Sequence, residues 1–213
     1  MVDPLNVINS GQLNTEDGPG SETQLNLDYT YPFAEKSKIE AGYQSRFQRS
    51  VDVTRLYWYD AESADYVIQP RFSNDTQYNQ DIHSIYGIYA AEKGNLGYQL
   101  GLRGEYTYRV IEVASVADDF VFDRFDIFPT FHSSYKLPSD QQMLASYSRR
   151  IERPRGWFLE PFITWTDAFN VRQGNPDLQP EYIDAMELGY RKGLGEHAIS
   201  FEGYYRISHN KVE

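Results

Sequence analysis

Seven charged side chains occupy alternate positions of segments whose other positions are apolar or aromatic. In the stretch Leu96–Tyr108, Arg103 and Glu105 share one set of positions, while Leu100 and Leu102 share the other. A period of two predicts β-strands with one charged face and one apolar face. The charged groups could bind polar solutes or form ion pairs across neighbouring strands. These candidate residues, which we expect to line a water-filled lumen, are Arg46, Arg103, Glu105, Arg150, Glu187, Arg191 and Glu202.

A second set of candidate residues is aromatic and falls in segments that we expect to be long outer loops. Exposed aromatic rings on loops can bind ligands, sugars included, or can pack the loops against one another. The sequence leaves both interpretations open. The candidate ligand contacts are Tyr57, Trp58, Tyr59, Trp157, Phe158 and Trp165.

No arrangement of residues predicts catalysis or metal binding. His83, His132, His197 and His209 are scattered, and none has a second ligand at metal-binding spacing. The acidic stretch Asp118–Asp126 lacks the glycine and the glutamate of a calcium-binding loop. We therefore expect no enzyme activity, no catalytic residue, no metal and no cofactor.

The charged side chains must be positioned by strands, because the same alternation recurs along much of the chain. Residues 24–31, 38–47, 186–191 and 198–207 repeat it. Short turns are predicted at Pro32–Lys36, Glu92–Asn95, Leu137–Gln141 and Lys192–Glu196, and long polar loops at Gln48–Asp81, Arg109–Asp123 and Arg149–Glu181. Short turns that alternate with long loops are typical of an up-and-down antiparallel sheet. We expect an all-β fold, a meander of about eight strands without an amphipathic helix.

Proline interrupts one of these predicted strands. Pro129 lies within the strand expected through Phe125–Tyr135. A proline cannot donate a ladder hydrogen bond, so it is found mainly at strand edges and bulges. We therefore expect a bulge or a weakened strand pairing at this residue.

Composition excludes several classes of protein. The 213 residues include no cysteine, so disulfides and thiolate metal sites are absent. The net charge of −11 argues against nonspecific nucleic-acid binding. No run of 18 apolar residues predicts a membrane-spanning helix, but the strands of a membrane barrel leave a much weaker hydropathy signal. The start, MVDPLNV, lacks the basic and apolar regions of a signal peptide.

The apolar face of the predicted sheet could contact three environments. It could pack on a second sheet in a sandwich, point inward in a soluble barrel, or face lipid in a membrane barrel. Ordinary strands have about 5–6 residues, whereas membrane strands need about 9–11. The alternation over Leu96–Tyr108 is long enough for a membrane strand. Tyr98 and Tyr106 lie on either side of Leu100 and Leu102, as residues of two aromatic girdles would. Periodicity alone leaves the membrane barrel and a soluble β-sheet protein open.

A longer segment carries a more specific pattern. Residues 146–190 contain, in order, the strand end Tyr147–Ile151, the motif Arg153-Pro154, Pro161-Phe162, Gly174–Leu178, and a strand that ends at Tyr190. This segment resembles the barrel of TonB-dependent outer-membrane receptors, which belong to the outer-membrane β-barrel proteins. Similarity extends over residues 24–207. One departure is Glu160, where the family pattern has asparagine.

The resemblance implies an internal slice of a large plugged receptor in the outer membrane of a Gram-negative bacterium. Residues 1–213 would form part of a transmembrane β-barrel, with residues 1–23 as an outer loop or tail, residues 24–207 as strands, and the plug domain absent from this chain. A transporter of this kind has about 22 strands and a plugged lumen. The implied partners are outer-membrane lipid, the plug of the same parent chain, an inner-membrane energy-coupling protein and a small nutrient, with no nucleic acid.

The resemblance leaves the nutrient open among siderophore, glycan and peptide. An alternative function from the residues themselves is a soluble secreted β-sheet carbohydrate-binding module. Its stacking platforms would be Trp58, Trp157 and Trp165. The two hypotheses differ in one structural feature, which is whether Leu100, Leu102 and Phe201 are exposed on a single sheet or buried between two.

Overall fold

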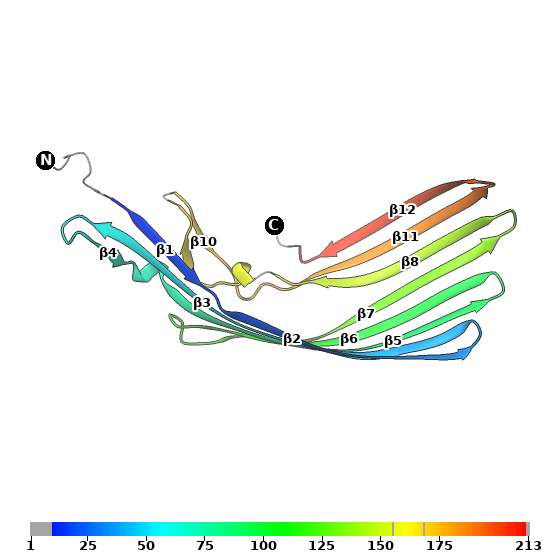
Figure 1. Cartoon of the computed structure of the whole chain (residues 1–213), viewed down its shortest axis with the longest axis horizontal. Coiled ribbons are helices and arrows are strands. Elements are labelled where there is room, and N and C mark those ends of the chain that lie inside the picture. Colours follow the sequence, from blue (N-terminus) through cyan, green and yellow to red (C-terminus); the bar gives the residue numbers. More distant parts are fainter. Residues whose placement is uncertain (1–9, 155, 168, 212–213) are drawn as a thin grey trace.

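A computed structural model of the chain describes residues 10–154, 156–167 and 169–211. Most of these residues form one antiparallel sheet of ten strands (Figure 1). The strands of the whole structure are β1 (Gln12–Asp17), β2 (Gly20–Ala34), β3 (Ser37–Asp60), β4 (Asp65–Ile68), β5 (Asn74–Lys93), β6 (Leu96–Val113), β7 (Phe120–Leu137), β8 (Gln141–Glu152), β9 (Ile163–Trp165), β10 (Val171–Gln173), β11 (Glu181–Leu194) and β12 (His197–His209). The strands β9 and β10 form a separate two-stranded sheet.

The large sheet follows the predicted meander. Its order is β1-β3-β5-β6-β7-β8-β11-β12, and β2 and β4 also pair with β3. Because β1 and β2 pair with successive parts of β3, they continue one another along the same edge. The four predicted short turns are confirmed, and all lie at the same end of the sheet (Figure 1).

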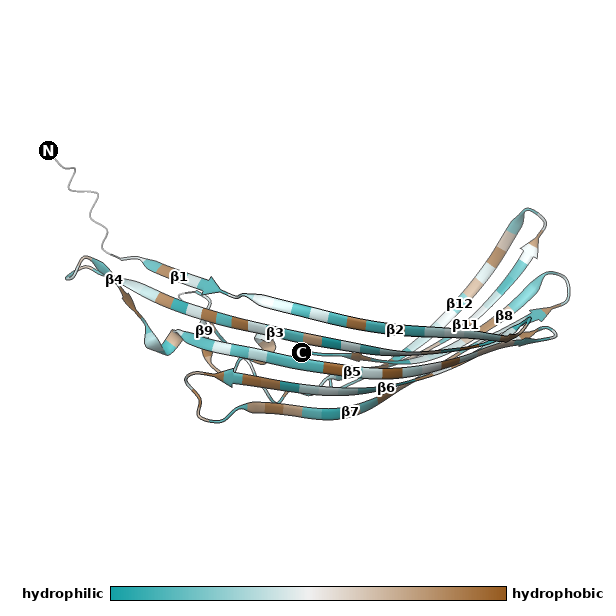
Figure 2. Cartoon of the chain, turned by 60° about the horizontal axis from the view of Figure 1, so that its bottom comes forward, coloured by the Kyte–Doolittle hydropathy of each residue, from teal (hydrophilic) through white to brown (hydrophobic). Residues whose placement is uncertain are grey.

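Hydrophobic and hydrophilic residues follow one another in short bands along the strands (Figure 2), and the register of the strands places them on two unlike faces, as the alternation predicted. Leu100, Leu102 and Phe201 are 48%, 57% and 67% exposed, and no second sheet covers them in the described part of the chain. We call their side of the sheet the aliphatic face. Arg103 and Glu105 lie on the opposite side, which we call the polar face. Figure 1 shows that the sheet curves and that β10 lies on its concave side.

The strands continue much farther than the sequence predicted. The predicted loops Gln48–Asp81 and Arg109–Asp123 are mostly wrong, because these connections shrink to residues 61–73 and 114–119. The predicted loop Arg149–Glu181 agrees closely with the connection observed at residues 153–180. β3 alone has 24 residues, whereas a membrane crossing needs about 9–11. Beyond the membrane both faces of a strand meet water, so the sequence turns polar although the ladder continues.

The boundary of the apolar band is visible on the aliphatic face. From Tyr43 onward, in the direction away from the short turns, this face carries polar groups. The first of them is His83, whose Nδ1 lies 2.9 Å from the Tyr43 hydroxyl in a hydrogen bond. Farther from the turns, Arg49 pairs with Asp81 on the same face. Charged pairs are costly in hydrocarbon, so these residues lie outside the lipid core.

The amino-terminal boundary of the sheet also differs from the prediction. Residues 1–23 were expected to form an outer loop or tail, but β1 and the start of β2 fall within them. Both segments form strands because they hydrogen-bond to the long strand β3, a pairing that their own sequence does not reveal. Residues 1–9 of the predicted tail lie outside the described residues.

Pro129 weakens the sheet without a bulge. The register between β6 and β7 continues unbroken through the pair Leu102 and Pro129. On the other edge of β7, the ladder to β8 ends at the pair Thr130 and Ser148, next to the proline. Because proline has no N–H group to donate, β7 and β8 separate beyond this row. The expected weakening is therefore confirmed and the bulge is wrong.

Helical structure is limited to two short 3-10 turns in the described residues, η1 (Pro70–Phe72) and η2 (Gly156–Phe158). No helix in this part of the chain is long and apolar enough to cross a membrane.

Candidate functional site

The connection between β8 and β11, residues 153–180, folds back onto the polar face of the sheet. Leu159 from this connection is completely buried against Ile111 and Val113 of β6. Four partly buried side chains complete this cluster, which are Tyr78, Phe120, Phe162 and Leu178. Burial of a leucine of this kind contributes about 1.5–3 kcal/mol, so the connection is held by apolar packing as well as by polar contacts.

An ionic cluster ties the same connection to the wall of the sheet. The buried carboxylate of Glu105 accepts a hydrogen bond of 2.8 Å from Nη2 of Arg103 and also pairs with Arg153 at the start of the connection. Arg153 donates a second hydrogen bond to the Thr107 hydroxyl at 3.1 Å, and Arg103 donates one to Gln44 at 2.9 Å. Two guanidinium groups thus compensate one buried carboxylate.

Tyr182 bridges the separation between β7 and β8. Its hydroxyl, on β11, donates a hydrogen bond of 2.7 Å to Asp126 of β7. Asp126 also pairs with Nε of Arg124 at 3.0 Å. The guanidinium groups of Arg124 and Arg149 lie over the Tyr182 ring at 5.1 and 5.2 Å. Side chains therefore close the seam that the backbone ladder leaves open.

A cavity of about 640 Å³ lies between the connection and the strands β1, β3, β5 and β6. Cavities of roughly 300–1,000 Å³ commonly bind small ligands. Carboxylates, guanidinium groups and one indole ring line it, among them Asp52, Glu160, Arg153, Arg172 and Trp157. The site can therefore contact a small polar solute on several sides.

Glu160 is the best defined acid of this cavity. Nη2 of Arg172 donates a hydrogen bond of 2.9 Å to its carboxylate. Burial raises the pKa of Glu160 above its usual 4.5, with smaller contributions from Asp52 and Glu16, and the hydrogen bond from Arg172 opposes the shift. The raised pKa reports that the charged form is only partly compensated in this position.

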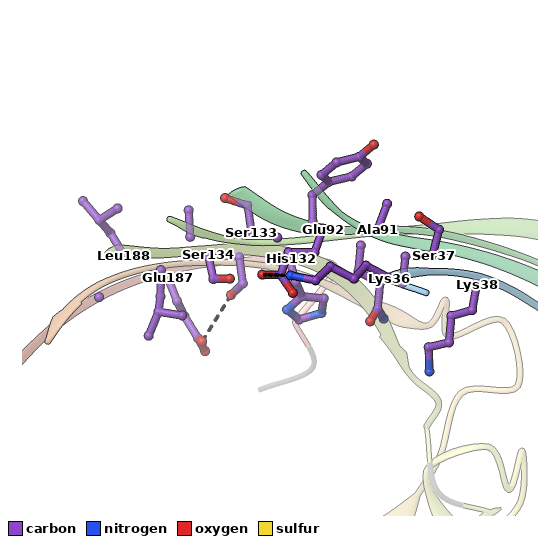
Figure 3. A pocket seen from close by; sticks show the side chains of 18 of the residues that line it. Lys36, Ser37, Lys38, Ala91, Glu92, His132, Ser133, Ser134, Glu187 and Leu188 are labelled. Carbon is purple, nitrogen blue, oxygen red and sulfur yellow. Dashed lines mark hydrogen bonds and ion pairs between the residues drawn. The ribbon is translucent and has the colours of Figure 1, made fainter. Parts of the chain in front are cut away.

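A second cavity, of about 840 Å³, lies near the short turns (Figure 3). Lys36 pairs with Glu92 at its rim at 3.2 Å, and Lys136 reaches the same carboxylate oxygen at 3.3 Å. Deeper in this cavity, Ser146 donates a hydrogen bond of 3.2 Å to Glu187. Small, charged and apolar residues all line this cavity, among them Ser134, Glu202 and Leu144.

The seven predicted charged residues share the polar face, but they do not form one site. Arg103 and Glu105 belong to the ionic cluster described above. Arg46 lines the cavity of about 640 Å³, whereas Glu187 and Glu202 line the cavity near the turns. The remaining two, Arg150 and Arg191, lie in β8 and β11.

Three of the six predicted aromatic residues lie in a strand, and the other three, Trp157, Phe158 and Trp165, lie in the connection where a long loop was predicted. Tyr57, Trp58 and Tyr59 lie in β3, where β1 and β4 pair with them, so their assignment to a loop is wrong. Trp157 and Phe158 lie in η2 and stack on each other.

The aromatic rings mostly pack against other rings. Trp165 of β9 contacts both Trp58 and Phe72, with ring centroids 5.6 and 5.4 Å apart. Tyr59 packs edge to face on Tyr66 at 5.5 Å. Loop packing, one of the two interpretations left open by the sequence, therefore accounts for several of these rings.

The histidines remain dispersed. His83 contacts the Tyr43 and Ser45 hydroxyls, His132 lines the cavity near the turns, and His209 lies 3.2 Å from Asp184. Within the described residues, no three histidine or acidic side chains converge in a geometry that could hold a metal ion.

The sequence did not identify the residues that complete the cavity between the connection and the sheet. Arg153, Glu160 and Arg172 fall in a segment expected to be a loop, and Asp52 falls in another. These four residues share no local sequence pattern. The sequence therefore does not specify which strands the connection contacts.

Comparison with known proteins gives a family and a fold. The family model of the outer membrane protein β-barrel family matches residues 4–213. No curated protein sequence matches the chain.

Several solved structures share the fold. The copper transporter OprC has a TM-score of 0.66 and 14% identity over 92% of this chain and 31% of its own. The ferric yersiniabactin uptake receptor FyuA from Yersinia pestis has a TM-score of 0.58 and 10% identity, covering 92% of this chain and 30% of its own. The ferric citrate transporter FecA, unliganded, has a TM-score of 0.57 and 14% identity, covering 93% and 28%.

The chain thus spans about 30% of the length of these structures. At this level of identity the likeness establishes the fold, and it confirms the predicted resemblance to the barrels of TonB-dependent receptors. One curved sheet with an exposed aliphatic face agrees with the match of the family model to nearly the whole chain. The protein belongs to the outer membrane protein β-barrel family and is a β-barrel protein of the Gram-negative outer membrane.

Proposed function

We propose that this chain forms part of the wall of a plugged outer-membrane receptor for energy-coupled uptake of a small nutrient. The observation that carries the proposal is the pair of unlike faces on one sheet. An aliphatic face with Leu102 57% exposed suits lipid, and a polar face with buried ion pairs suits a water-filled lumen. The fold shared with OprC, FyuA and FecA supports the same assignment.

In this proposal the wall itself carries out no reaction on the nutrient. Energy comes from an inner-membrane protein acting through a plug domain of the parent chain. The seven charged residues of the polar face line the lumen, and the aromatic residues of β3 and the connection lie near the outer rim, where a ligand enters. The nutrient is a siderophore, a glycan or a peptide.

The proposal is tested by deleting the gene in its native host. Growth and uptake are then measured with iron–siderophore complexes, glycans or peptides as the limiting nutrient. We expect the deletion to abolish high-affinity uptake of one of these classes, and a protonophore to abolish the same uptake in the parent strain. Uptake that survives the protonophore would contradict energy coupling, and unchanged uptake of all three classes would contradict a receptor for them.

The alternative of a carbohydrate-binding module receives less support. It requires Leu100, Leu102 and Phe201 to be buried between two sheets, and they are exposed on one. It also requires tryptophan rings with a free face for stacking. Trp58 and Trp157 are 39% and 40% exposed, but Trp58 packs against Trp165 and Trp157 stacks on Phe158. A chain that purifies as a monodisperse monomer without detergent would favour this alternative.

A further inference from the structure

Three carboxylates and three guanidinium groups line the cavity between the connection and the sheet. Glu16 of β1, Asp52 of β3 and Glu160 of the connection are close enough to interact electrostatically with one another and with Arg172. Arg172 hydrogen-bonds to Glu160, while Asp52 accepts only a long contact of 3.5 Å from the Thr54 hydroxyl in the described structure. The other two guanidinium groups of the lining pair with carboxylates outside it, Arg46 with Glu22 and Arg153 with Glu105. Arg172 is then the guanidinium left beside three carboxylates, a surplus of two negative charges.

A separate observation indicates that a ligand belongs in the cavity. Thr76 of β5 lines it and is only 7% exposed. Its hydroxyl oxygen is buried and has no hydrogen-bond partner among the described residues. Thr76 lies directly opposite Asp52 in the register of β3 and β5. A buried hydroxyl without a partner is costly, and a polar group of a ligand beside Asp52 would satisfy it.

One cationic group of the chain, the guanidinium of Arg172, already lies between an aromatic ring and a carboxylate in this cavity. The guanidinium of Arg172 lies 5.2 Å from the centroid of the Trp157 ring. The same guanidinium pairs with Glu160. A carboxylate next to an aromatic face is an arrangement that binds guanidinium and ammonium groups. The position of Arg172 therefore shows that a guanidinium group fits between the Trp157 ring and the Glu160 carboxylate.

The other cationic residues of the cavity are less suited to bind an anion. Arg153 is engaged with Glu105 and with the Thr107 hydroxyl. Arg46 lies 3.7 Å from Glu22. An anionic ligand would have to compete with these carboxylates and would also meet the surplus negative charge near Asp52.

We propose that this cavity binds the ammonium or guanidinium group of a small solute, with Asp52 and Glu16 as the charge partners and Thr76 as a hydrogen-bond partner. The proposal rests on the proposed receptor function and adds to it a substrate class, which is a basic peptide or another solute that carries an amine. Arg172 lies beside the bound cation and limits its approach to Glu160.

The test measures binding to the full-length protein purified in detergent, by isothermal titration calorimetry. The probes are trilysine, trialanine amide acetylated at its amino terminus, and triglutamate, at low ionic strength. We expect trilysine to bind at least about tenfold more tightly than either of the others. In the double variant Glu16→Gln and Asp52→Asn, the affinity for trilysine should fall by about tenfold. The matched control is the double variant Asp118→Asn and Asp119→Asn, which removes the same charge from an exposed loop.

Two results would overturn the proposal. One is triglutamate or the neutral peptide binding as tightly as trilysine, and the other is unchanged trilysine affinity in the Glu16 and Asp52 variant. If that variant does not fold, the single variant Glu16→Gln replaces it, because Glu16 is exposed, and a loss of about threefold is then expected.

The binding experiment and the uptake experiment can each reject one proposal without rejecting the other. Trilysine binding that depends on Asp52, together with unchanged nutrient uptake in the deletion strain, would retain the cation site and reject the receptor function. Energy-dependent uptake without a preference for trilysine would retain the receptor and reject the cation site.

Discussion

The Tyr86 hydroxyl of β5 donates a hydrogen bond to the carboxylate of Asp28 on β2, and the tyrosine crosses the intervening strand β3 at Gly42. A Cβ atom on Gly42 would lie 2.5 Å from Cε1 of Tyr86 and 2.7 Å from the backbone oxygen of Leu27. Glycine is therefore required here by the close approach of a ring and a backbone. This contact links three strands on the polar face, close to the edge of the sheet.

Gly42→Ala should lower the free energy of unfolding by about 1–3 kcal/mol, because overpacking forces the ring or the backbone to move. Urea denaturation in detergent, followed by tryptophan fluorescence, measures the change. Gly87→Ala is the matched control, since a Cβ there meets no atom within 4 Å. Equal stability of the two variants would contradict the steric requirement at Gly42.

Arg153→Gln should release the connection from the wall. The buried Glu105 would keep Arg103 but lose its second guanidinium partner, at a cost of about 1–3 kcal/mol. We expect limited proteolysis to cut residues 153–180 faster than in the parent protein. Arg150→Gln removes the same charge nearby, and Arg150 forms no ion pair in the described structure, so its cleavage rate should not change. Slow cleavage in both variants would show that apolar packing of Leu159 alone holds the connection.

Leu102→Arg should impair assembly in the membrane. Leu102 is exposed on the aliphatic face, and an arginine facing the middle of the bilayer costs about 2–4 kcal/mol. The yield of folded, heat-modifiable protein in outer-membrane fractions reports the effect. Gln99→Arg places the same side chain on the opposite face of β6 and should be tolerated. If the two variants assemble equally well, the assignment of lipid to the aliphatic face is wrong.

Acidification should stabilise the packing of the connection through Glu160. Burial raises the pKa of this carboxyl above 4.5 in the folded state, so the folded state binds the proton more tightly than the unfolded chain does. The favourable contribution is complete below pH 4.5 and is lost as the pH rises through the raised pKa. Proteolysis with an acid-tolerant protease and one active at neutral pH, each normalised on unfolded protein, measures it. In Glu160→Gln this pH dependence should be smaller; an identical profile in the variant would reject the role of Glu160.

The alternation of side chains was sufficient to predict the two faces of the sheet. Along Leu96–Tyr108 every leucine and tyrosine was assigned to one face, and Leu100 and Leu102 are indeed exposed there. The short turns were equally predictable, because each joins two alternating segments. Membrane and lumen impose this contrast residue by residue, so it is visible in a single sequence.

The upper parts of the strands and the polar cavity were not predictable in the same way. Beyond Tyr43 both faces of β3 meet water, and polarity no longer distinguishes a strand from a loop. The pairing of Arg153 with Glu105 joins residues 48 positions apart, and no local pattern specifies such a contact. Of the groups around the ionic cluster, the alternation therefore identified Arg103 and Glu105 but missed their partner from the connection.

The separation of β7 from β8 at Pro129 has a mechanical consequence. Between the pair Thr130 and Ser148 and the short turn at Leu137–Gln141, separating β7 from β8 requires the rupture of consecutive backbone hydrogen bonds. Beyond that pair, away from the short turns, the two halves of the wall are joined by the side chains around Tyr182 and by the packing of the connection on β6, not by a backbone ladder. The outer part of the sheet can thus widen between β7 and β8, while the part embedded in lipid keeps its shape.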